Sequence, residues 1–315
     1  MTTMRAAAFQ AFGDPQQVQV LDLPMPRAGA GEVVVRVAAA TVNPTDLMML
    51  TGKQASMMTT LQPPFVAGME FAGVVHETGA GVTALAPGQP VMGIVNPRRP
   101  EGGAQAEYVV VPQESLAALP GSADLVGAAT LPMNGLTALM VIEAVGLPRG
   151  ATVLLTGAAG AVGGYVIALA RDAGLTVIAD AKDTDVEWVR QQGAQEVVPR
   201  GVAMAAAVRA AHPGGVDGLV DAALLGNAAA ALVRDGGIAV TLRRSNPVTD
   251  ARLRTHNIAV AERVRDAAGM QRIAQWLADG VLVPRVAARV PLADAAQAFQ
   301  LLDRGGLRGR VVLVC

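Results

Sequence analysis

A short glycine-rich segment constrains the fold of this chain more than any other feature. Residues 151–156 form an apolar run that predicts a buried strand. Residues 154–164, which begin within this run, read LLTGAAGAVGG. The residues that follow predict a helix over 163–173. A tight glycine turn between a buried strand and a helix is typical of an open sheet of parallel strands.

The same strand–helix alternation continues after this turn. Further strands are expected at 175–179, 218–221 and 237–242, and further helices at 184–192 and 227–233. The last strand of this series is expected at 258–264. Such a rhythm predicts a doubly wound parallel sheet with helices on both faces, and so an α/β fold class.

The glycine turn has the chemistry of a phosphate site. A Cβ at Gly160 would collide with a diphosphate, and a Cβ at Gly163 would keep helix and strand apart. The start of the following helix supplies free N–H groups and a positive dipole end. Ala158 stands at the first glycine position of the usual fingerprint, which still permits a tight turn. We therefore predict that a dinucleotide binds at Gly157, Ala158, Ala159, Gly160, Ala161, Val162 and Gly163. A tight connection without a ligand is the alternative, and the alternation that follows favours the nucleotide.

The end of the second strand bears on which dinucleotide binds. Residues 177–185 read VIADAKDTD and contain both signs of charge. Lys182, with Arg200 after the next strand, could hold the 2′-phosphate of NADPH. Asp180 or Asp183 could instead hold the 2′-hydroxyl of NADH, and all four could be solvated loop charges. The basic pair favours NADPH, with NADH possible.

The first third of the chain has a different texture. Short valine-rich strands are expected at 33–38, 71–76 and 106–111, separated by Gly- and Pro-rich loops. Strands spaced in this way predict a small β-barrel or a partly open sheet. We expect helices at 267–278 and 292–302 and a strand at 310–314 to return to this first domain. The predicted domains are therefore 1–122 with 265–315, and 123–264.

The bulk composition excludes several classes of protein. The formal net charge is -1 and aromatic residues make up 3%, so neither nucleic acid nor an anionic membrane is an expected partner. No apolar run reaches the roughly 20 residues that span a bilayer. The one cysteine, Cys315, allows no internal disulfide. We expect a cytoplasmic protein.

Seven motifs occur in an order that resembles one family. They are MRAAAF at 4–9, GEVVVRV at 31–37, VNPTDL at 42–47, GMEFAGVV at 68–75, GAQAEYV at 103–109, LPMNGLTA at 131–138 and TGAAG at 156–160. Together they resemble the zinc-free medium-chain dehydrogenase/reductase superfamily, in its quinone oxidoreductase-like (zeta-crystallin-like) branch. The resemblance implies a GroES-like β-barrel catalytic domain, a Rossmann domain, and a homodimer joined through the last Rossmann strand around 258–264.

The resemblance also bears on metal binding. Zinc alcohol dehydrogenases hold their catalytic metal with Cys, His and Cys, and the matching positions here are Asn43, Met69 and Met133. An amide and two thioethers are poor ligands for Zn²⁺. The segment that would carry a structural zinc is replaced by a short stretch at 96–103, and the three histidines are scattered. We expect no zinc, and an acceptor that needs no Lewis acid: a quinone or an α,β-unsaturated carbonyl.

Three further site residues follow from the resemblance. Asn43 could bond the nicotinamide ribose or the acceptor oxygen, and its alternative is a turn residue before Pro44. Thr137 could orient the nicotinamide, and its alternative is a helix hydroxyl bonded to the preceding turn. Leu225 lies where such proteins approach the nicotinamide by backbone. Met48 stands where many relatives have a tyrosine, which favours protonation from solvent.

The sequence thus predicts an NADPH-dependent reductase of quinones or enones, with Asn43 and Thr137 as its catalytic residues. An enoyl-thioester reductase of the same family is one alternative. A dinucleotide-binding sensor or structural protein with little turnover is the other.

Overall fold

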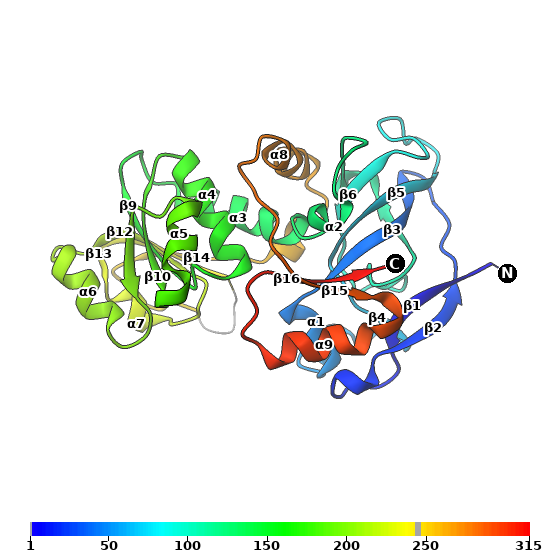
Figure 1. Ribbon diagram of the computed structural model, residues 1–315, viewed down its shortest axis with the longest axis horizontal. Helices are drawn as coiled ribbons and strands as arrows, with labels where there is room; N and C mark the ends of the chain where they lie inside the picture. Colours follow the sequence, from blue (N-terminus) through cyan, green and yellow to red (C-terminus); the bar gives the residue numbers. More distant parts are fainter. Residues whose placement is uncertain (1, 243–246) are drawn as a thin grey trace. The chain divides into compact units, whose positions relative to one another are not determined.

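The computed structural model describes residues 2–242 and 247–315 and consists of two compact units (Figure 1). Unit 1 comprises Met1–Met133 and Arg263–Cys315, and unit 2 comprises Asn134–Glu262. The first boundary lies eleven residues later than the predicted one at 122/123, and the second lies two residues earlier than 264/265. Met133 belongs to unit 1, where its N–H donates to Glu70 Oε2 at 2.8 Å.

Unit 1 is built around one long strand, β3 (Glu32–Val42). It pairs antiparallel with β5 (Glu70–Thr78), β7 (Tyr108–Pro112) and the C-terminal strand β16 (Arg310–Val314). The sheet continues to β6 (Pro90–Ile94) and β8 (Leu116–Ala118) on one side and to β15 (Val286–Pro291) on the other. A second sheet has the order β2-β1-β4, from Gln19–Pro24, Thr3–Phe9 and Phe65–Val66. The last strand of the chain therefore completes the sheet that the first third begins.

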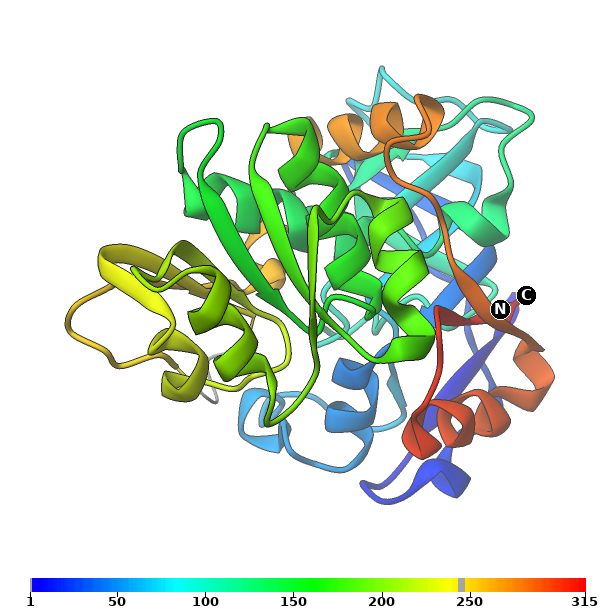
Figure 2. The same cartoon turned by 60° about the vertical axis from the view of Figure 1, so that its left-hand side comes forward.

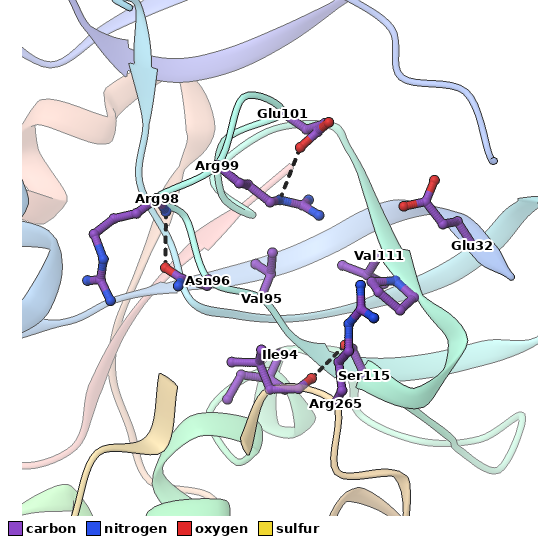
Figure 3. Close-up of a pocket in the computed structure, with 12 residues that line it drawn as sticks. Glu32, Ile94, Val95, Asn96, Arg98, Arg99, Glu101, Val111, Ser115 and Arg265 are labelled. Atoms are coloured by element: carbon purple, nitrogen blue, oxygen red, sulfur yellow. Dashed lines mark hydrogen bonds and ion pairs between the residues drawn. The ribbon is translucent and has the colours of Figure 1, made fainter. Parts of the chain in front are cut away.

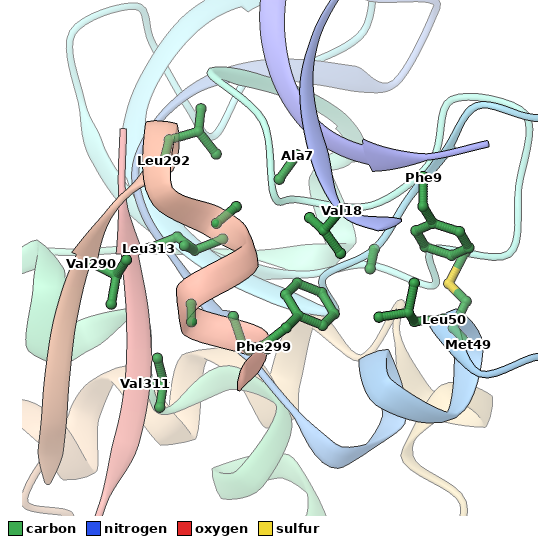
Figure 4. Packing of buried hydrophobic residues seen from close by; sticks show 14 of the residues in the cluster. Ala7, Phe9, Val18, Met49, Leu50, Val290, Leu292, Phe299, Val311 and Leu313 are labelled. Atoms are coloured by element: carbon green, nitrogen blue, oxygen red, sulfur yellow. The ribbon is translucent and has the colours of Figure 1, made fainter. Parts of the chain in front are cut away.

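Unit 1 also contains four α-helices: α1 (Pro44–Leu50), α2 (Leu125–Ala128), α8 (Ala267–Ala278) and α9 (Ala295–Arg304). Helix α9 buries Ala298 and Phe299 and exposes its charged face, so it packs as an amphipathic helix. Phe299 lies in one apolar cluster with Phe9, Leu50 and other buried side chains of both chain ends (Figure 4). This core, rather than sequence proximity, holds the C-terminal segment in unit 1.

Unit 2 contains a six-stranded parallel sheet in the order β11-β10-β9-β12-β13-β14. Its strands are Glu196–Pro199, Thr176–Ala181, Thr152–Thr156, Val216–Asp221, Val233–Thr241 and Arg254–Asn257. The helices are α3 (Pro132–Val145), α4 (Ala161–Asp172), α5 (Val186–Gln192), α6 (Met204–Ala211) and α7 (Asn227–Ala230). The alternation can be followed from green to yellow in Figures 1 and 2.

The helices of unit 2 divide between the two faces of this sheet. Met204 and Val208 of α6 share a buried cluster with Ala229 and Ala230 of α7 and with Leu154 of β9. Helices α4 and α5 contact each other and also β10. Because the chain moves outward from β9 to β11 and then returns to β12, right-handed connections place α4 and α5 opposite α6 and α7. The predicted α/β class, with a doubly wound sheet in one domain, is confirmed.

Two predicted elements are wrong. The last strand is not 258–264: β14 ends at Asn257, and Val260–Arg263 forms a 3₁₀ turn. All four residues of β14 are exposed and polar, so no apolar pattern marks them as a strand. The apolar residues that recur after Asn257 instead resemble the pattern of a strand. The helix expected at 227–233 ends at Ala230, because Val233 already begins β13. Among the helices in the described ranges, none is long and apolar enough to cross a membrane.

Candidate active site

The predicted nucleotide turn joins β9 to α4 in unit 2. Gly157 has φ +70°, a left-handed conformation that favours glycine, and Gly160 caps the helix without a side-chain bond. The first N–H used by the helix is that of Gly164, which donates to Gly160 O. Within residues 2–242 and 247–315, the N–H groups of Ala159, Ala161, Val162 and Gly163 make no hydrogen bond. Four donors at one turn are therefore unbonded, as a phosphate site requires.

Two glycines of the turn are required for different reasons. A Cβ on Gly163 would lie 2.5 Å from the carbonyl oxygens of both Gly157 and Ala158, so close packing excludes a side chain there. A Cβ on Gly160 would meet only Gly157 O, at 3.1 Å, and Gly160 is exposed. A side chain at Gly160 would therefore require Gly157 O to shift only slightly, whereas one at Gly163 would clash. The space over Gly160 is thus open to a ligand.

The acidic residue near the end of β10 is committed to the turn itself. Asp180 is 2% exposed and accepts the N–H of Ala158 at 3.1 Å. Burial raises the pKa of the Asp180 carboxyl, and the bond from Ala158 and the charge of Arg200 oppose that rise. Arg200 Nε lies 3.7 Å from Asp180 Oδ2, while Lys182 and Asp183 are exposed. Lys182 forms no ion pair within the part of the chain that the structure describes.

The loop after β12 lies against the glycine turn. A Cβ on Gly157 would come within 3.1 Å of Ala222 C and Ala223 N. Leu225 exposes 42% of its surface, and its N–H donates to Asp221 Oδ1 at 3.0 Å. The backbone at Leu225 was predicted to approach the nicotinamide, but the N–H of Leu225 is already bonded to Asp221. Sequence reasoning missed Asp221, whose only signal was an acidic residue closing a buried strand.

The second group of predicted residues belongs to unit 1. Asn43 is fully buried, and its Nδ2 donates to Thr41 Oγ1 at 2.9 Å and to Glu70 Oε1 at 3.3 Å. Its Oδ1 accepts a hydrogen bond from Arg310. Both ends of the amide are therefore used inside unit 1. Thr137 is 8% exposed on α3 and belongs to unit 2.

A buried ion pair organises the surroundings of Asn43. Glu70 is fully buried, Arg310 is 6% exposed, and the two form a salt bridge. Glu70 Oε1 also accepts the hydroxyl of Thr41 at 2.7 Å, and Arg310 donates to the same hydroxyl oxygen at 3.0 Å. Sequence reasoning missed this pair, although a charge within an apolar strand was a signal in both cases.

Asp46 closes the same cluster from helix α1. It accepts the N–H of Asn43 at 2.8 Å, the N–H of Gly68 at 3.1 Å and Gln105 Nε2 at 3.2 Å. Burial raises the pKa of Asp46 to about 7, although the two backbone bonds lower it. Gln105 Oε1 is buried without a partner within the described ranges. The cluster is thus polar, buried and almost fully hydrogen-bonded.

The three positions compared with a zinc site lie around Glu70. Met69 precedes it in the chain, and Asn43 and the N–H of Met133 bond its two oxygens. The Met69 sulfur accepts the Thr45 hydroxyl at 3.7 Å, and Met69 and Met133 are both buried. The described residues contain no group of three or more His, Cys, Asp or Glu side chains that could hold a metal ion.

Unit 1 also contains a cavity of about 260 Å³ that none of the predicted site residues lines (Figure 3). Arg99 borders it, donates to Gly102 O at 2.9 Å and lies 3.9 Å from Glu101. Burial lowers the pKa of the Arg99 guanidinium. Arg265 and Glu32 also line this cavity, so its charges are mixed.

Comparison with known proteins agrees with this architecture. Residues 29–121 match the family described as Alcohol dehydrogenase GroES-like domain, and residues 192–313 match the one described as Zinc-binding dehydrogenase. A probable oxidoreductase from Mycobacterium abscessus has a similar structure over 100% of both chains, with a TM-score of 0.82 and 31% sequence identity. The chain belongs to the medium-chain dehydrogenase/reductase superfamily. Proteins named quinone oxidoreductase and trans-enoyl reductase are among its relatives.

Three curated relatives show how far this similarity extends. NAD(P)H oxidoreductase RTN4IP1 of Drosophila melanogaster is 35% identical over 62% of this chain and 52% of its own length. The 2-methylene-furan-3-one reductase of Solanum lycopersicum is 26% identical over 98% and 79%. The chloroplast envelope quinone oxidoreductase homolog of Arabidopsis thaliana is 29% identical over 64% and 64%. The chain thus spans about half the length of the first relative.

Proposed function

We propose that this oxidoreductase uses NADPH to reduce quinones or α,β-unsaturated carbonyls without zinc. The observation that carries the proposal is the set of four unbonded N–H groups at the turn before α4, beside an open Gly160. Donors in this arrangement fit a diphosphate, which bound NADPH would place there. The names of the tomato and Arabidopsis relatives support the two acceptor classes.

The residues at the end of β10 support NADPH over NADH. Asp180 is buried and already accepts the Ala158 N–H, so it is poorly placed to accept a ribose hydroxyl. Lys182 and Arg200 supply two cationic groups after β10 and β11, and Arg200 is half-exposed. Guanidinium and ammonium groups at this edge would hold a 2′-phosphate. NADH stays possible, because Asp183 is exposed in the same segment.

Bound NADPH would supply the hydride, and the protein would bind the cofactor, orient the acceptor and exclude water. A quinone or an enone suits a site without a Lewis acid, because hydride addition leaves a delocalised phenolate or enolate. Amide and thioether groups at Asn43, Met69 and Met133 suit such chemistry better than they suit Zn²⁺. With Met48 in place of a tyrosine, the proton would come from solvent. Asn43 and Thr137 stay the predicted catalytic residues, with the Glu70–Arg310 pair fixing Asn43.

Turnover assays test the proposal directly. NADPH absorbance at 340 nm is followed with benzoquinones, alkenals and a crotonyl thioester as acceptors, together with zinc analysis of the same sample. Oxidation with quinones or alkenals by zinc-free protein is the expected result. Reduction of the thioester alone would identify an enoyl-thioester reductase. Tight NADPH binding without turnover would identify a sensor or structural protein, and activity that depends on stoichiometric zinc would contradict the proposal.

The proposal includes a cytoplasmic homodimer that acts on a small molecule. The edge strand β14 (Arg254–Asn257) pairs with β13 on one side, and the described residues place no strand on its other side. A second copy could continue the sheet there. Light scattering should give the mass of two chains, and a monomer at all concentrations would exclude this part.

A further inference from the structure

Two strands of unit 2 end side by side in residues that the nucleotide fingerprint does not include. Thr156 ends β9, Asp221 ends β12, and the two are directly paired in the parallel ladder. The Thr156 hydroxyl donates to Asp221 Oδ1 at 2.6 Å and accepts the N–H of Ala223 at 3.1 Å. Both side chains are fully buried. The pair joins the loop after β12 to the strand that leads into the glycine turn.

The same carboxylate shapes the rest of this loop. Asp221 Oδ1 accepts the N–H of Leu225 at 3.0 Å, and Oδ2 accepts the N–H of Gly226 at 2.7 Å. Leu224, directly before these two residues, has φ +60°, and among the described residues no other non-glycine residue has a positive φ. A left-handed conformation costs a non-glycine residue about 1 kcal/mol, so other interactions of the loop must offset that cost. Strain of this kind, held by buried bonds, is typical of functional loops.

The bonds to Thr156 and Asp221 use N–H groups of the loop and leave several of its carbonyl groups unbonded. The N–H groups of Ala223, Leu225 and Gly226 are used. The carbonyl groups of Ala222, Ala223 and Leu225 accept no hydrogen bond from any residue in 2–242 or 247–315. The loop therefore presents acceptors, whereas the neighbouring glycine turn presents donors. A dinucleotide has the matching groups: phosphates that accept, and ribose hydroxyls and a carboxamide that donate.

We propose that Thr156 and Asp221 are positioning residues that aim the carbonyls of Ala222, Ala223 and Leu225 at the donor groups of the nicotinamide riboside. This inference rests on the proposed dinucleotide function and deepens it. The diphosphate would bind the N–H groups of the turn, and the riboside would bind the loop that the pair holds. Neither side chain would touch the cofactor.

The test compares a whole and a truncated ligand. Dissociation constants for NADPH and for adenosine 2′,5′-bisphosphate, which lacks the nicotinamide riboside, are measured by calorimetry for wild type and Thr156→Val. Removing the hydroxyl should weaken NADPH about tenfold, because the loop loses its anchor, and should leave the fragment unchanged. Thr152→Val, at the start of the same strand, is the matched control and should change neither constant.

Thr156→Ser keeps the hydroxyl and should restore NADPH affinity, which also covers the case in which the valine variant unfolds. Equal weakening of NADPH and of the fragment would reveal a general structural role and overturn the inference. Unchanged NADPH affinity in a folded Thr156→Val variant would overturn it as well. Failure of the wild type to bind either ligand would instead remove the proposed function, and the inference with it.

Discussion

The two polar regions of this protein use their hydrogen-bonding groups in opposite ways. In unit 1 the buried side chains of Asn43, Glu70 and Arg310 bond one another, and Asp46 bonds the adjacent backbone. In unit 2 the turn before α4 and the loop after β12 leave donors and acceptors unused. Buried polar groups without partners are costly, so the bonds within the unit 1 cluster stabilise the fold of that unit. The unused groups at a strand edge are those that a ligand can satisfy.

The largest effect should follow from breaking the buried ion pair of unit 1. Arg310→Met leaves Glu70 charged and buried, and removal of one partner from such a pair costs about 3–5 kcal/mol. We expect the free energy of unfolding in urea to fall by this amount. The double variant Glu70→Gln with Arg310→Met leaves no unpaired charge and should lose less than Arg310→Met alone. Glu70→Gln alone completes the cycle, and strict additivity of the two single changes in the double variant would contradict a coupled pair.

The pH dependence of unit 1 should depend on Asp46. Its pKa of about 7 in the folded protein lies above the ordinary value of 3.8, so folding favours the protonated carboxyl. This contribution is complete below pH 3.8 and is lost as the pH rises through 7, on the order of 4 kcal/mol in total. Asp46→Asn should flatten the fall in unfolding free energy between pH 4 and pH 7. Exposed Asp303→Asn is the control, and equal slopes for wild type and Asp46→Asn would refute the assignment.

A substitution at Gly160, on the exposed side of the glycine turn, should change NADPH binding more than it changes stability. Gly160→Asp places a negative side chain over the four N–H donors, and we expect NADPH affinity to fall by about 100-fold or more, since charge-assisted bonds contribute about 1.5–3 kcal/mol each. The melting temperature should change little, because a Cβ there meets only Gly157 O. Gly121→Asp, on an exposed loop with nothing within 4 Å, is the matched control. Undiminished NADPH affinity in a folded Gly160→Asp variant would contradict the claim that the glycine turn, unlike the unit 1 cluster, binds a ligand.

A smaller effect should separate the two nicotinamide nucleotides. Replacing both Lys182 and Arg200 by alanine should weaken NADPH about tenfold more than NADH, because only NADPH carries the 2′-phosphate. Calorimetry with both nucleotides measures the ratio. The double variant Arg27→Ala with Lys53→Ala, which removes two exposed charges of unit 1, should leave the ratio unchanged. Equal losses for NADPH and NADH would assign Lys182 and Arg200 to the solvated surface.

The sequence predicts local features of this fold well and distant partnerships poorly. The glycine turn and most strands of unit 2 follow from spacing and apolar runs, because those signals lie within a few residues. Glu70 and Arg310 are 240 residues apart, and Thr156 and Asp221 are 65 apart, so no local pattern pairs them. Strand β14 was misplaced for a related reason: its residues are exposed and polar, and they pair with the distant strand β13. The sequence also could not show that the Asp180 side chain accepts a hydrogen bond from the N–H of Ala158, because no local pattern gives the direction of a side chain.

The central claim is that the turn between β9 and α4 binds a dinucleotide, and calorimetric titration of the folded chain with NADPH tests it most directly. We predict one NADPH bound per chain, with affinity lowered about 100-fold or more by Gly160→Asp and retained in Gly121→Asp. A folded wild-type chain that binds neither NADPH nor NADH would contradict the account.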